Sequence, residues 1–114
     1  GLPSETNGIL SITTIQQTVA KEWGVTVDGL RSKTRTKTLT VPRQIAMYLT
    51  RELLATQLVE IGNAFGGRDH STVIHSIEKV QQAVSRDSQL KARINRLRGI
   101  LETFNKSPGS VWKQ

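Results

Sequence analysis

Apolar residues recur at helical spacing along most of the chain. In the first such segment, which follows Ser11, they come every three or four residues: Ile12, Ile15, Val19 and Trp23. This spacing predicts one face of an amphipathic helix. Gly24 is suited to end that helix as a C-cap, and Thr26 is suited to cap a short turn that holds Val27 and Leu30.

A second helix is predicted to begin at Pro42, because proline fits the first turn of a helix. Its broad apolar face is formed by Ile45, Ala46, Leu49, Leu53 and Leu54. The preceding residues 31–41 alternate bases with Ser and Thr. This stretch is too polar for a buried strand, and we interpret it as a basic loop.

Two helices separated by a tight turn are predicted for residues 58–84. Residues 58–65 form a short amphipathic segment, Gly66-Gly67 interrupts it, and a helix follows from His70 to Val84. The positions of this helix that are predicted to face the core are Val73, Ile74, Ile77, Val80 and Val84.

A last helix is predicted over Asp87–Phe104, with Leu90, Ile94, Leu97, Leu101 and Phe104 as its stripe. No stretch of useful length alternates with a period of two, so the fold class is all-α with five to six helices. Residues 1–10 are predicted to be a linker or tail, residues 11–104 the domain, and residues 105–114 a C-terminal tail. The chain does not begin with Met, and we expect a processed or excised fragment.

The net charge of +7 is concentrated in two stretches. Residues 31–51 hold six bases and no acid, and residues 85–114 hold seven bases and two acids. Such clustering is typical of a surface that binds a polyanion, although a basic surface kept for solubility has the same composition. There is no cysteine, which excludes disulfides and cysteine metal sites.

The helix-turn-helix pattern of residues 58–84 is also compatible with a plain αα-hairpin. What favours DNA is the start of the second helix, where residues 68–72 are all polar and the apolar stripe begins only at Val73. The first residues of a recognition helix reach base edges in the major groove. Asp69 is equally suited to cap the helix, and one aspartate can do both.

The basic loop is a candidate arm for phosphates and the minor groove. An arginine inserts well where that groove is narrow, and Arg35 lies in the middle of the loop. On the following helix, spacing allows Arg43, Gln44 and Arg51 to share a face.

Catalytic motifs are lacking. The sequence has no GxxxxGK[ST], GxSxG or HExxH. Its two histidines, His70 and His75, would lie ~140° apart around a helix, which is unsuited to a metal site. We therefore expect a binding domain, not an enzyme, with no cofactor.

Three segments, residues 42–49, 58–62 and above all 64–75 (AFGGRDHSTVIH), resemble the DnaA family of bacterial chromosomal replication initiators. The resemblance covers residues 11–104 and implies a Trp-repressor-like helix-turn-helix domain that binds DnaA boxes of the TTATNCACA type. By matching position, it implies that Arg35 reads the minor groove and that Asp69, His70 and Ser71 read the major groove. The implied phosphate contacts are Arg43, Gln44, Arg51 and Thr72, with Lys37 and Lys79 as weaker candidates.

The sequence departs from the family pattern at three places. Ser71 stands where many members have Thr, which removes a methyl group for thymine contact. Residues 33–37 contain fewer arginines than in some relatives, which weakens the assignment of Lys37. Val59 stands where relatives often have Pro.

The resemblance also implies the setting of the domain. The full initiator carries an ATP- or ADP-binding AAA+ module, which this chain lacks. Regulatory proteins and acidic phospholipids are implied as further partners, the isolated domain is expected to be monomeric, and its location cytoplasmic and nucleoid-associated. Two other classes remain open at this stage, a repressor that dimerises on palindromic DNA and a helical protein–protein module.

Overall fold

The computed structural model describes residues 9–104, which form six helices. They are α2 (Ile12–Trp23), α3 (Val27–Arg31), α4 (Lys37–Leu54), α5 (Leu58–Ala64), α6 (His70–Arg86) and α7 (Ser88–Leu101). The predicted all-α class is confirmed. In the described part of the chain, no helix is both long and apolar enough to cross a membrane.

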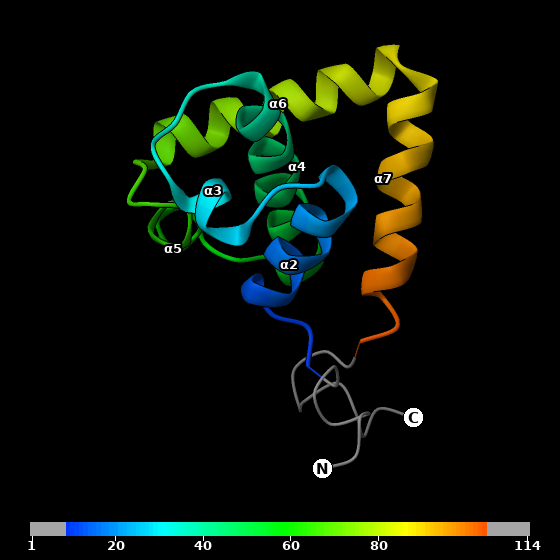
Figure 1. Cartoon of the computed structure of the whole chain (residues 1–114), viewed down its shortest axis with the longest axis horizontal. Helices are drawn as coiled ribbons and strands as arrows, with labels where there is room; N and C mark the ends of the chain where they lie inside the picture. Colours follow the sequence, from blue (N-terminus) through cyan, green and yellow to red (C-terminus); the bar gives the residue numbers. More distant parts are fainter. Residues whose placement is uncertain (1–8, 105–114) are drawn as a thin grey trace.

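Helix α4 is the centre of the fold. It packs against α2, α3, α5 and α6, while α7 packs against α2 and α6 (Figure 1). The fully buried side chains come from many elements, among them Leu30 of α3, Ile61 of α5 and Leu97 of α7. One continuous core therefore joins α6 to α3 and α4, the helices on either side of the preceding loop.

The start of α4 differs from the prediction. The helix begins at Lys37, so Pro42 lies inside it and the loop is only residues 32–36. The extra turn is favoured by packing: the side chain of Leu39 lies against Gly29, where an added Cβ would be 2.7 Å from Leu39 Cδ2. Pro42 removes one backbone donor from this helix.

Four helices begin with a side chain that caps the first turn. The side chains of Ser11, Thr26, Asp69 and Asp87 each accept a hydrogen bond from a backbone N–H in the first turn of α2, α3, α6 and α7. Gly24 ends α2 in the left-handed conformation with φ 69°. The predicted caps at Thr26 and Gly24 are confirmed, as is Asp69 in its capping role.

The predicted ends of the domain need one change. Leu10, which lies in the predicted linker of residues 1–10, is buried with the core residues. Residues 1–8 and the predicted tail 105–114 lie outside the described residues. Helix α6 continues two residues beyond the predicted Val84, to Arg86, and α7 ends at Leu101, before the half-buried Phe104.

The turn between α5 and α6 requires glycine at two close approaches. A Cβ on Gly62 would lie 1.9 Å from the carbonyl oxygen of Arg68. Gly66 has φ +91°, and a Cβ there would lie 2.2 Å from the carbonyl oxygen of Arg31. Only glycine allows the turn to pack this tightly against α5 and the end of α3. The turn thereby carries Arg68 to the basic loop.

Candidate nucleic-acid interface

The first turn of α6 presents polar side chains to solvent. His70, Ser71 and Thr72 are all exposed. Asp69 is also exposed, and its Oδ1 accepts a hydrogen bond from the Thr72 N–H at 3.0 Å. Hydrogen bonds from Thr72 hold the pKa of the Asp69 carboxyl below its usual range. The carboxylate is therefore charged at neutral pH, at the exposed start of the second helix.

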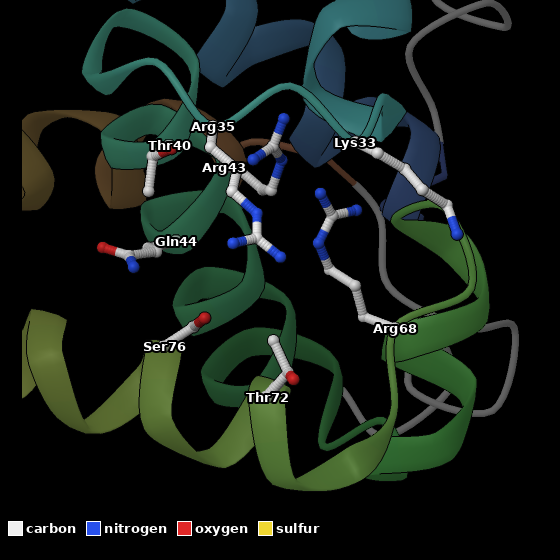
Figure 2. A pocket seen from close by; sticks show the side chains of 8 residues that line it. All are labelled: Lys33, Arg35, Thr40, Arg43, Gln44, Arg68, Thr72 and Ser76. Atoms are coloured by element: carbon white, nitrogen blue, oxygen red, sulfur yellow. The ribbon is translucent and has the colours of Figure 1, made fainter.

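A basic hollow of about 430 Å³ lies beside this turn, between the 32–36 loop, α4 and α6 (Figure 2). Its lining residues are Lys33, Arg35, Thr40, Arg43, Gln44, Arg68, Thr72 and Ser76. Four of them are cations, three are hydroxyl residues and none is an acid. In Figure 2 the guanidinium groups of Arg35, Arg43 and Arg68 point toward the same space. Such a lining suits an oxyanion.

The hollow continues along α6. A neighbouring hollow shares Gln44, Thr72 and Ser76 with the first and adds His75, Glu78, Lys79 and Gln82. Both Lys79 and His75 are exposed. Gln44, Thr72 and Lys79, which the sequence singled out for phosphate binding, are thus brought together on one face.

Arg43 was predicted to lie on the surface of its helix, but it is buried. Its side chain is buried, at 4% exposure, with Nε donating to the Leu30 carbonyl at 2.8 Å and Nη2 to the Gly29 carbonyl at 3.0 Å. Burial, followed by the nearby charge of Arg68, lowers the pKa of Arg43 below its usual value. Arg43 therefore faces the basic hollow while two of its nitrogen atoms fix the end of α3.

Arg51 does not join Arg43 and Gln44. Eight residues further along α4, it is exposed, donates from Nη1 to the Thr56 carbonyl at 2.6 Å and lines a separate hollow with His70 and Val59. The shared face of Arg43, Gln44 and Arg51 is therefore not formed. Lys37 is exposed at the first residue of α4, and Arg35 is exposed in the loop.

Arg68 is the residue that sequence reasoning missed. It was regarded as part of a polar turn, yet its Nη2 donates to the Ser32 carbonyl at 2.6 Å and its Nη1 donates to the Phe65 carbonyl. Burial, and after it the charge of Arg35, lowers the pKa of Arg68. The available signal was the position of Arg68 directly after Gly66-Gly67, where a turn can bring a side chain back onto an earlier segment.

The second basic stretch of the sequence has a different use. Arg93 and Arg96 of α7 both bind Glu22 Oε2, at 2.8 and 2.6 Å, and Arg98 binds Glu52 Oε1 at 2.6 Å. The guanidinium of Arg93 also stacks on Trp23, 4.0 Å from its ring centroid. These three arginines attach α7 to the rest of the fold. The expectation of a polyanion footprint is therefore wrong for them.

A short helix, a glycine turn and a second helix whose polar first turn lies beside a basic hollow define a helix-turn-helix domain of the DNA-binding class. Residues 12–92 match the family model described as the bacterial dnaA protein helix-turn-helix. The chain belongs to this family, whose members are DNA-binding domains of replication initiators.

Two chromosomal replication initiator proteins DnaA are similar to the chain. The protein from Lactiplantibacillus plantarum is 47% identical over 94 residues, which is 82% of this chain and 21% of the relative. The protein from Citrifermentans bemidjiense is 45% identical over 94 residues, 82% of this chain and 20% of the relative. The chain thus spans about a fifth of the length of these relatives.

A solved structure has the same fold. It is described as the crystal structure of a DNA replication initiation factor, superposes with a TM-score of 0.72 at 34% identity, and the match covers 79% of this chain and 27% of that one. The predicted class of helix-turn-helix fold and the resemblance to the DnaA family are confirmed.

Proposed function

We propose that this domain binds a DnaA box of the TTATNCACA type in duplex DNA, as the DNA-reading part of an initiator of chromosomal replication. The start of α6 enters the major groove and the 32–36 loop enters the neighbouring minor groove. The observation that carries the proposal is the acid-free basic hollow that joins these two elements. A DNA backbone placed over this hollow lets both elements reach base edges from one side of the duplex.

The residue roles are those that the family resemblance implies, and the exposure of these side chains supports them. His70, Ser71 and Asp69 read bases in the major groove, and Arg35 reads the minor groove. Asp69 Oδ1 accepts one hydrogen bond from the Thr72 N–H, which leaves Oδ2 free of that bond to accept from a base. Because Ser71 has no methyl group, its role is limited to hydrogen bonding.

The phosphate roles divide between two sides of the α6 N-terminus. Gln44, Thr72 and Lys79 hold phosphates along α6, and Lys37 contributes from the start of α4. Arg51 holds a phosphate on the other side of the α6 N-terminus, beside His70. Arg43 contributes mainly charge, since its Nε and Nη2 bind carbonyls within the protein.

Titration of the domain with a labelled duplex tests the proposal. At ~150 mM salt, we expect the box to bind at least about 100-fold more tightly than a scrambled duplex. With about 4–6 phosphates neutralised, log K should fall against log[salt] with a slope of about −4 to −5. Equal, weak binding to both duplexes would refute sequence recognition, and a flat salt response would refute the phosphate contacts.

Two variants separate the roles. Asp69→Asn keeps a capping side chain but adds a hydrogen-bond donor, so we expect it to change base preference with little loss of stability. Arg51→Ala should weaken box and scrambled DNA equally. If Asp69→Asn weakened both duplexes equally as well, Asp69 would not read bases.

A further inference from the structure

The 32–36 loop begins at a junction made by one arginine. Ser32 is the C-cap of α3 and the first residue of the loop, and its carbonyl accepts from Arg68 Nη2 at 2.6 Å. The same guanidinium donates from Nη1 to the Phe65 carbonyl in the turn before α6. One rigid, planar group thus joins the start of the loop to the helix-turn-helix turn.

The backbone of Arg68 is itself fixed. Its N–H donates to the Gly62 carbonyl at 3.0 Å, and the Gly67 N–H donates to the same oxygen at 2.9 Å. On the α3 side, Arg43 holds the Leu30 and Gly29 carbonyls. Both ends of the connection are therefore anchored, one on α5 and the other on α4, and the Arg68 guanidinium hydrogen-bonds from the turn to the start of the loop.

Hydrogen-bond geometry, not charge pairing, makes this junction. Both groups that Arg68 binds are neutral backbone carbonyls. The neighbouring cations Arg35 and Arg43 repel it, and no acid lines the hollow. A lysine at position 68 would keep the charge but lose the fork that reaches two carbonyls at once.

We propose that Arg68 is a positioning residue that sets the separation of the two DNA-reading elements, the 32–36 loop and the first turn of α6, and hence the spacing of the two parts of the site that the domain accepts. This inference rests on the proposed function, because it assumes that both elements read one DNA site.

The test compares wild type, Arg68→Lys and a control, Arg31→Lys, which also keeps the charge and alters an exposed neighbour. Each protein is titrated with a TTATNCACA duplex and with a duplex that has one extra base pair between TTAT and CACA. We expect Arg68→Lys to reduce the preference for normal spacing by about tenfold, which corresponds to about 1.4 kcal/mol. Arg31→Lys should keep the wild-type ratio. An unchanged ratio in Arg68→Lys would overturn the proposal.

A double-mutant cycle with Arg35→Ala shows whether Arg68 acts through the loop. If it does, Arg68→Lys should change box affinity less than about twofold once the Arg35 side chain is absent. Full additivity of the two losses would mean that Arg68 acts elsewhere, and the proposal would fail.

A DNA-free measurement separates failure of this inference from failure of the proposed function. Limited trypsin digestion reports cleavage after Lys33 and Arg35, both exposed in the loop. We expect faster cleavage there in Arg68→Lys than in wild type and in Arg98→Met, a variant in α7 that controls for reduced global stability. If the wild type does not prefer the box, the proposed function fails, and the cleavage rates alone then test the role of Arg68. Unchanged loop cleavage in Arg68→Lys overturns that role, and faster cleavage supports it.

Discussion

Two groups of arginines in this domain have opposite surroundings. Arg35, Arg43 and Arg68 converge on a hollow without an acid, whereas Arg93, Arg96 and Arg98 are paired with Glu22 and Glu52. The first group leaves positive charge available for a ligand. In the second group the charges form ion pairs that attach α7 to α2 and α4. Clustered positive charge marks a ligand surface only where the fold supplies no acid of its own.

The largest expected difference is in the free energy of unfolding, between alanine substitutions at two glycines, one beside each group of arginines. Gly66→Ala should lower the free energy of unfolding by about 2–4 kcal/mol, because a Cβ there needs an unfavourable positive φ and overlaps the Arg31 carbonyl. Gly99→Ala, at an exposed position of α7 with nothing within 4 Å of the added Cβ, should raise it by about 0.5 kcal/mol. Urea denaturation measures both. Equal effects would show that the turn does not depend on its glycine.

The next largest effect is on DNA affinity. Arg35→Ala should weaken box binding by about 10–100-fold without changing stability, because the proposed base contact is worth about 1–3 kcal/mol. Arg96→Ala removes the same charge from the paired group and should change affinity less than about twofold at 150 mM salt. Fluorescence anisotropy gives both constants. A similar loss of box affinity in the two variants would show that only the net charge of the domain matters for binding.

A smaller effect concerns stability in the paired group. Glu52 and Arg98 are partly exposed, so their coupling should be about 0.5–1 kcal/mol. A double-mutant cycle of Glu52→Gln and Arg98→Met in urea measures it. The same variants should leave box affinity unchanged. Coupling near zero would mean that packing alone holds α7 in place.

The smallest effect is a pH dependence. The hydrogen bond from Arg93 holds the pKa of Glu22 below its usual range, so its stabilisation is present above the usual glutamate pKa and is lost as pH falls through the lowered one. Glu22→Gln should therefore destabilise the domain at pH 7 and match wild type in acid. Thermal unfolding between pH 7 and pH 3 measures this. A difference that does not shrink as the pH falls would assign the loss to packing, not to charge.

Much of the fold was predictable because it depends on local patterns. The periodicity of Ile12, Ile15 and Val19 predicts α2 almost to its ends, and Gly66-Gly67 marks the turn before α6. The start of α4 was predicted wrongly, because Leu39 is stabilised there by Gly29, a residue ten positions away that no local pattern identifies. The burial of Leu10 in the core was likewise not visible in the local pattern, which predicted a linker there.

The candidate site was predictable only in part. The exposed start of α6 with His70 and Ser71, and the exposed Arg35, lie where the sequence placed them. The structure also brings Thr72, Gln44 and Lys79 together. It separates Arg51 from Arg43, buries Arg43 against α3, and adds Arg68, whose importance depends on the Ser32 carbonyl 36 residues earlier.

By itself the sequence determined the helices, the glycine turn, the polar start of the second helix and the total positive charge, because spacing and residue type fix these locally. Only the tertiary structure decided which arginines remain available to a ligand. The reason is that the long arginine side chains pair with residues far away in the sequence. Arg93 pairs with Glu22, 71 residues away, and Arg98 pairs with Glu52, 46 residues away. Charge can be counted along the chain, but its neutralisation depends on the folded arrangement.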